Sequence, residues 1–422
     1  MHEPQSPTAA PRIELLPLKA GLPEGQAGEV TVLARLYPAP PAEVGGFRPP
    51  LNLALVIDRS GSMSGPPLAM ARRAVQVALQ TLQPHDRVSV VAFDGQVEPV
   101  VMPQLVNDPQ ALCRAVEGIT AGGSTALHAG WLEGAMLSAQ FHDPRALNRV
   151  LLLSDGQANA GETRPEVIAQ HVRGLNARGV GTSTVGLGRS YDETLLQAMA
   201  DAGDGNYEHI EDAEELPGFF QTELQGLTRT TGLTVSLGVE PNPALGSLRQ
   251  EVLNDLPRND LGRWQLPNLI AGRPLEVVFT VQIPAQQRAA ELGVTRVRVA
   301  WTDREGRRHR LRAQLNLPVL GAAAYDRLAE DERVRVAAER LRAARVREQA
   351  VAYAVAGQVQ LSRETLVREH RRLAAFQSTD LAQEVAALSE LDADFGRDEQ
   401  LARKRAASQS YNTRRSKDPQ SR

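Results

Sequence analysis

Between residues 51 and about 230, short apolar strands alternate with amphipathic helical segments, and this alternation is the strongest constraint on the fold. The apolar runs are "LNLALVID", "DRVSVVAFDG", "NRVLLLSDG" and "VGTSTVGLG". In the segment "PPLAMARRAVQVALQTL", apolar residues recur three or four positions apart and so share one helical face. Strands that alternate with helices in this way predict an α/β domain, a doubly wound and mostly parallel sheet covered on both faces.

The other regions have different patterns. Residues 231–320 alternate apolar and polar residues in runs such as "LEVVFTVQIP" and "TRVRVAWTD", which predicts an antiparallel β-sandwich. Residues 1–50 contain two strand-like runs, "RIELLPL" and "EVTVLARLY". We expect these runs to complete the sandwich, so that the α/β domain is inserted in it or lies next to it.

The C-terminal part has two patterns. Residues 321–400 are rich in Ala, Arg, Glu and Leu at helical spacing and predict a helical bundle, with one long helix over 322–358 followed by two shorter ones. Residues 401–422 are polar and lack periodicity, with seven Lys and Arg against Asp418. We expect them to form a disordered basic tail.

Length and composition exclude several classes of protein. A chain of 422 residues is long enough for two or three domains, and its net charge of −3 gives no general argument for nucleic acid or membrane. The single cysteine, Cys113, rules out an internal disulfide and fits a reducing compartment. We find neither a signal-peptide segment in the first thirty residues nor an apolar stretch that could span a bilayer, so we expect a cytoplasmic protein.

Oxygen-bearing side chains gather where the apolar strands end. Asp58, Ser60 and Ser62 follow the first strand, Thr125 follows a glycine pair before a helix, and Asp155 follows the strand "VLLL". Because parallel strands end at one edge of a sheet, we expect these five side chains to converge there. Two carboxylates and three hydroxyls suit Mg²⁺, with Mn²⁺ or Ca²⁺ as alternatives, and such a cation would relieve the repulsion between the carboxylates.

Some assignments in this set stay open. Ser124 is an alternative to Thr125, and Asp155 could bind the metal directly or through water. Ser64 and Ser154 are expected to be turn and cap residues and not ligands. The alternative to a metal site is a hydrogen-bonded turn that caps the following helix.

The three motifs together resemble the metal-ion-dependent adhesion site of von Willebrand factor type A (VWA) domains, which reads Asp-x-Ser-x-Ser, then Thr, then Asp. Here Asp58, Ser60 and Ser62 match the first motif, Thr125 the threonine and Asp155 the last aspartate. The segments "VVAFDG", "STVGLG" and "MADAGDGNY" are similar to the framework of intracellular bacterial members with an inter-alpha-trypsin-inhibitor-like arrangement. The resemblance covers residues 51 to about 230.

The resemblance implies a doubly wound fold that binds Mg²⁺ or Mn²⁺. It also implies a partner protein whose Asp or Glu completes the coordination of the metal. Some intracellular bacterial members work alongside MoxR-type AAA ATPases, and such a system is a candidate partner. We therefore expect a non-enzymatic scaffold protein.

Two other functions compete with this expectation. A metal with open coordination positions can activate water, so a metal-dependent hydrolase or phosphatase is the first. The chain has neither an HExxH pair nor a phosphate-binding loop after a strand, and His128 is expected to lie on a helix surface or partly buried. The second is association with nucleic acid through the basic tail. We expect the tail to be solvated instead, and we expect neither nucleic acid nor a membrane as a partner.

Overall fold

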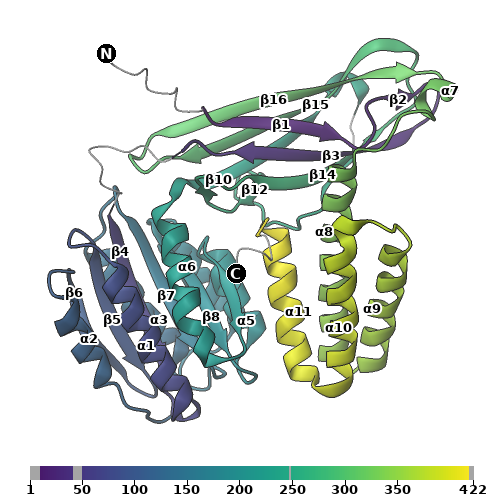
Figure 1. The fold of residues 1–422 in the computed structure, drawn as a ribbon. Helices are drawn as coiled ribbons and strands as arrows, with labels where there is room; N and C mark the ends of the chain where they lie inside the picture. Colours follow the sequence, from purple (N-terminus) through teal and green to yellow (C-terminus); the bar gives the residue numbers. More distant parts are fainter. Residues whose placement is uncertain (1–9, 41–49, 247–248, 418–422) are drawn as a thin grey trace, which may run out of the picture.

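The computed structural model describes residues 10–40, 50–246 and 249–417. These residues form an α/β domain, a β-sandwich and a bundle of helices (Figure 1). In Figure 1 the α/β domain and the helical bundle lie side by side below the sandwich, and helix α11 (Glu399–Arg414) contacts strand β9 (Tyr207–Ile210) between them. The predicted N-terminal region and the predicted tail are described only in part, because residues 1–9, 41–49 and 418–422 lie outside the described residues.

The α/β domain is built on one six-stranded sheet with the order β6-β5-β4-β7-β8-β9. Its strands are β4 (Leu51–Asp58), β5 (Arg87–Phe93), β6 (Val97–Leu105), β7 (Leu147–Ser154), β8 (Val180–Leu187) and β9. All pairs are parallel except β5 with β6. The chain builds outward from β4 to β6 and then returns to add β7 on the other side of β4. The prediction of a doubly wound, mostly parallel sheet is therefore confirmed.

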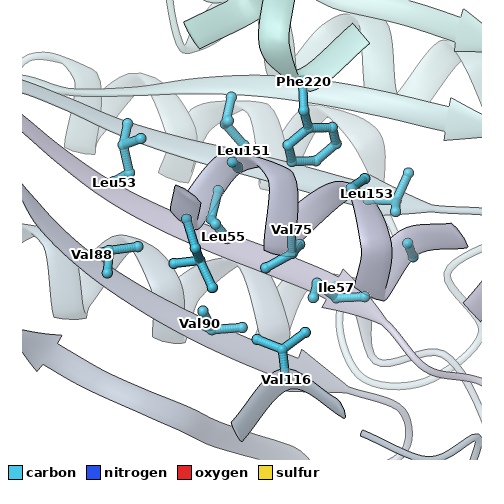
Figure 2. Packing of buried hydrophobic residues seen from close by; sticks show 14 of the residues in the cluster. Leu53, Leu55, Ile57, Val75, Val88, Val90, Val116, Leu151, Leu153 and Phe220 are labelled. Carbon is cyan, nitrogen blue, oxygen red and sulfur yellow. The ribbon is translucent and has the colours of Figure 1, made fainter. Parts of the chain in front are cut away.

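Helices cover both faces of this sheet. On one face lie α1 (Pro66–Thr81), α2 (Pro109–Glu117) and α6 (Leu216–Thr228), and on the other α3 (Leu127–Gln140), α4 (Pro165–Asn176) and α5 (Glu193–Ala202). Because side chains alternate along a strand, β4 contributes to both cores. Leu55 packs in one cluster with Val75 and Phe220 on the first face (Figure 2). Val56 belongs to the cluster on the second face. Each such buried apolar side chain contributes about 1.5–3 kcal/mol, so both faces hold the strand ends in place.

The sandwich is formed by strands that precede the α/β domain in the sequence and by strands that follow it. One sheet has the order β1-β3-β14-β11 and the other β12-β10-β15-β16-β2, with β13 paired to β10. The strands are β1 (Arg12–Pro17), β2 (Leu22–Pro23), β3 (Gly28–Tyr37), β10 (Thr230–Pro241), β11 (Gln250–Val252), β12 (Trp264–Leu266), β13 (Leu269–Ile270), β14 (Leu275–Ile283), β15 (Ala289–Thr302) and β16 (Arg308–Leu320). The α/β domain is thus inserted in the sequence between β3 and β10.

The C-terminal helices differ from the sequence-based expectation of one long helix and two shorter ones. They are α7 (Ala322–Tyr325), α8 (Glu332–Val355), α9 (Val359–Ala374), α10 (Ala382–Arg397) and α11. The expected long helix is broken after Tyr325, and α8 begins at Glu332. Asp331 caps this helix, because its carboxylate accepts a hydrogen bond from the backbone N of Arg333 at 3.0 Å. A side chain that satisfies the free N–H groups of the first turn in this way favours a new helix start.

The prediction of a disordered tail over residues 401–422 is wrong up to residue 417, because α11 is a helix that packs on the α/β domain. Arg403 and Lys404 both form ion pairs with Glu193 of α5, and the Tyr411 hydroxyl donates to the carbonyl of Gly205 at 3.0 Å. Sequence periodicity does not show these contacts, since the acids that pair with the basic residues lie some 200 positions earlier in the chain.

Three further arginines of this segment also have acidic partners, which weakens the case for binding nucleic acid through it. Arg405 pairs with Glu211 and Asp394, Arg414 with Glu348, and Arg415 with Asp201. Lys417 is partly exposed, and its partial burial lowers its pKa to about 8. Arg422 lies outside the described residues.

Across the described residues, none of the helices combines the length and the apolar composition that crossing a bilayer requires.

Candidate metal centre

Three loops at one edge of the α/β sheet bring the five predicted residues together. Asp58 is the last residue of β4, and the chain continues through the short 3₁₀ turn Gly61–Met63 to α1. Thr125 lies just before α3, and Asp155 directly follows β7. Since β4 and β7 are neighbours whose connections leave in opposite directions, a crevice is expected between their carboxyl ends.

Hydrogen bonds connect the first of these loops to the third. The Ser62 hydroxyl donates to Asp155 Oδ1 at 2.7 Å, and the hydroxyl oxygens of Ser60 and Ser62 are 3.2 Å apart. Within the first loop, the backbone N of Ser60 donates to Asp58 Oδ1 at 2.8 Å. Four of the five predicted side chains therefore belong to one network.

The fifth residue, Thr125, is placed by its distance to Gly156. A Cβ atom added to Gly156 would lie 3.3 Å from Thr125 Oγ1, 3.5 Å from Ser62 Oγ and 3.9 Å from Asp58 Oδ2. Oxygen atoms of the first two motifs thus surround a position beside Asp155 that has no side chain of its own. The alternative ligand Ser124 has its hydroxyl 2.7 Å from a Cβ placed on Gly95, in the turn after β5, which favours Thr125.

Comparison with known proteins agrees with this arrangement. Residues 51–209 match the model of the family described as von Willebrand factor type A domain. Residues 51–209 of this chain form a VWA domain. The match covers β4 through most of β9, and thus all five residues of the candidate site.

Two sequence relatives match about half of this chain or less. A protein of Synechocystis, called sll0103, is 30% identical over 221 residues, which are 51% of this chain and 50% of that protein. Human inter-alpha-trypsin inhibitor heavy chain H3 is 32% identical over 184 residues, 41% of this chain and 21% of that protein. The chain thus spans half or less of the length of the curated relatives it matches.

A solved structure extends the likeness to the whole fold. The structure titled von Willebrand factor type A, from Catenulispora acidiphila, has a TM-score of 0.71 at 18% identity and covers 97% of this chain and 98% of that one. The combination of a VWA domain with the sandwich and the helices therefore occurs in another protein.

Burial disfavours the ionised form of the two carboxylates at the candidate site. Asp58 is fully buried, and burial raises its pKa despite hydrogen bonds from Ser154 and Ser60. Burial, and to a smaller extent the charge of Asp58, raise the pKa of Asp155 to about 6 against the hydrogen bond from Ser62. The protein's own groups thus leave the pair of carboxylates incompletely stabilised as anions, which is the situation that a hard cation corrects.

The donor set fits a hard divalent cation. All the candidate ligands are carboxylate or hydroxyl oxygens, the ligand types that Mg²⁺ prefers. Among the described residues there is no cluster of three or more His, Cys, Asp or Glu side chains that could hold a metal.

Ser154 and Asn159 position the candidate ligands, although sequence analysis did not assign them this role. The Ser154 hydroxyl donates to Asp58 Oδ2 at 2.5 Å. Asn159 Oδ1 accepts a hydrogen bond from the backbone N of Thr125 at 2.8 Å, and its own backbone N donates to the carbonyl of Thr125 at 3.1 Å. Ser154 had been expected to be a turn or cap residue, and its place at the end of β7 was the available signal.

Asp94, at the end of the segment "VVAFDG", fixes the loop that carries Thr125. Its carboxylate accepts hydrogen bonds from the backbone N of Gly123 at 3.2 Å and of Gln96 at 2.7 Å. A Cβ on Gly122 would lie 1.7 Å from Asp94 Oδ2, so a glycine is needed for this close approach.

His128, the histidine considered as a general base for hydrolysis, contacts residues outside the candidate site. His128 Nε2 lies 3.0 Å from His171 Nδ1, and its ring packs near Trp131. Burial, followed by the charge of His171, lowers the pKa of His128. These contacts belong to the α3–α4 surface and offer no argument for a general base at the site.

Proposed function

We propose that this VWA protein is a non-enzymatic scaffold that binds protein partners through a divalent cation held by Asp58, Ser60, Ser62, Thr125 and Asp155. We take Mg²⁺ as the expected ion. The observation that carries the proposal is that oxygens from two loops converge on the Cβ position of Gly156 in the third loop, where Ser62 also donates a hydrogen bond to Asp155. The VWA family itself suggests a role in protein interaction.

The burial of the residues sets the direction from which a partner approaches. Asp58, Ser60 and Thr125 are buried, whereas Ser62 is exposed and Asp155 is partly exposed. The buried groups would hold the inner side of the cation and Ser62 and Asp155 its outer side, with Asp155 acting directly or through water. A cation bound there would offer an open coordination position to a carboxylate of the partner.

The partner is therefore a protein that presents an accessible Asp or Glu. A contact between a carboxylate and a cation at a partly dehydrated edge is strong and directional, because little water competes there. We include in the proposal that the protein acts in the cytoplasm, and that a MoxR-type AAA ATPase system is a candidate partner.

The proposed metal-dependent binding of partner proteins is tested by immobilising the full chain and capturing its partners from a cell lysate. Wild type is expected to retain specific proteins in Mg²⁺ buffer and to release them in EDTA. Asp58→Ala is expected to retain none of them, whereas Ser64→Ala, an exposed serine six residues further along the same loop, should behave as wild type. Retention of the same proteins by Asp58→Ala, with and without EDTA, would show that the interaction does not use this site.

A further inference from the structure

The outer face of one sandwich sheet carries closely spaced arginines. Arg308, Arg310 and Arg312 occupy every second position on β16, and Arg296 and Arg298 do so on β15. Because side chains alternate along a strand, all five point away from the core that the intervening residues help to form. We call these five residues the arginine face.

The pairing of β15 with β16 brings like charges together on this face. Arg298 lies directly opposite Arg312, and Arg310 lies next to this pair, opposite Ala300. Like charges at directly opposite positions destabilise a sheet. Four of the five side chains are exposed, and Arg298 is partly exposed.

Few acidic groups neutralise the positive charge of the arginine face. Arg298 pairs with Glu240 at 3.0 Å, while Arg308 donates to a backbone carbonyl and to hydroxyls. No ion pair within the described part of the chain involves Arg310 or Arg312. Burial, followed by the charges of Arg263 and Arg310, lowers the pKa of Arg308.

The other sheet of the same sandwich provides an internal comparison. There Arg35 lies opposite Glu276, and their side chains pair at 2.6 Å. Part of that sheet is also covered, because Val334 of α8 packs with Leu33 and Val278. One outer face is therefore covered and balanced in charge, and the other carries an excess of positive charge that faces solvent.

The shape of the arginine face favours a linear polyanion. Same-face residues on a strand are about 6.8 Å apart, so the face is a strip two strands wide and about 20 Å long. Along one strand of duplex nucleic acid a phosphate follows about every 3.4 Å of the axis, so both the arginine face and the duplex carry closely spaced rows of charge of opposite sign. Guanidinium groups bind phosphate oxygens with two parallel hydrogen bonds.

We propose that the arginine face binds the phosphodiester backbone of duplex nucleic acid, without sequence preference. The outward positions of β15 and β16 carry no aromatic ring on which bases could stack, so contact is restricted to phosphates. This surface is separate from the metal site. Arg304, beside the β15–β16 turn, contacts the carbonyl of Pro50, just before β4 begins, whereas the metal site lies where β4 ends.

Fluorescence anisotropy with a labelled 24-base-pair duplex of mixed sequence tests the proposal, using the full chain at increasing NaCl concentrations. Four to five phosphate contacts predict that log K falls with log salt with a slope of about −4. The double variant Arg310→Gln/Arg312→Gln should weaken binding at least about tenfold at 50 mM salt and reduce the magnitude of the slope by about two. Arg296→Gln provides a second, single substitution on the other strand and should reduce the slope by about one.

Controls separate charge, location and metal dependence. Arg368→Gln/Arg371→Gln removes the same charge from exposed positions of α9 and should leave binding unchanged. Binding should also be unchanged in EDTA and in Asp58→Ala, so a failure of the proposed metal site would not affect this result. Absence of duplex binding by wild type, equal losses in both double variants, or binding to phosphatidylserine vesicles without binding to the duplex would overturn the proposal.

Discussion

The hydroxyl of Ser62 donates to Asp155 Oδ1 at 2.7 Å, although 93 residues separate the two in the sequence. This bond joins the loop after β4 to the loop after β7, the two neighbouring strands at which the direction of chain building reverses. Asp155 is partly exposed, whereas Asp58 is buried, so the Asp155 carboxylate lies nearer to solvent than that of Asp58.

Gly156 is expected to be essential for metal binding because the oxygens converge on the position that its Cβ would occupy. Gly156→Val should abolish the binding of Mg²⁺ or Mn²⁺ measured by calorimetry, with a melting temperature close to that of wild type in metal-free buffer. Gly123→Ala is the matched control, because a Cβ at Gly123 meets no atom within 4 Å. Unchanged metal affinity in Gly156→Val would place the ion elsewhere.

Ser154→Ala should weaken metal binding without abolishing it. The hydroxyl of Ser154 lowers the pKa of Asp58 by hydrogen bonding, so its removal makes the anionic ligand less stable. A lost hydrogen bond of this kind is worth about 1 kcal/mol, which corresponds to an affinity about fivefold lower. A full loss of binding would instead identify Ser154 as a direct ligand.

Docking of α11 is expected to depend on Glu193. Its side chain is buried against Lys404 and Arg403, so Glu193→Gln leaves the Lys404 ammonium in a buried site without its carboxylate. Breaking such a pair from one side costs about 3 kcal/mol, which should appear in urea unfolding. Glu390→Gln, an exposed position on α10, is the control and should stay within about 0.5 kcal/mol of wild type.

The same ion pair predicts a dependence of stability on pH. Burial alone would raise the pKa of Glu193, but the hydrogen bond and charge of Lys404, with the charge of Arg403, hold this pKa below its usual value. A carboxyl with a lowered folded-state pKa stabilises the fold above its unfolded pKa, about 4.3, and loses this contribution as the pH falls through the folded value. The difference in unfolding free energy between wild type and Glu193→Gln should therefore shrink below about pH 4. A difference that stays constant down to pH 3 would contradict this assignment.

Features of the fold that depend on residues close together in the sequence could be predicted, whereas contacts between distant residues could not. The α/β domain was predictable because Leu53, Leu55 and Ile57 belong to uninterrupted apolar runs, and because Asp58 and Asp155 stand directly after such runs. The ends of parallel strands meet at one edge, so the convergence of the ligands followed from topology alone.

The role of α11 was hidden because its partners are distant. Lys404 is read as a solvated charge in sequence, and only the fold brings Glu193 to it. The arginine face was missed for the same reason, since the opposition of Arg298 and Arg312 exists only once β15 pairs with β16.

The central claim is that oxygens of Asp58, Ser62 and Thr125 bind one divalent cation near Gly156. Anomalous diffraction from crystals grown in Mn²⁺ tests it most directly. We predict one Mn²⁺ peak in bonding contact with these oxygens in wild type and none in Asp58→Ala. A wild-type crystal at saturating Mn²⁺ with no peak among these side chains, or a peak that persists in Asp58→Ala, would contradict the account.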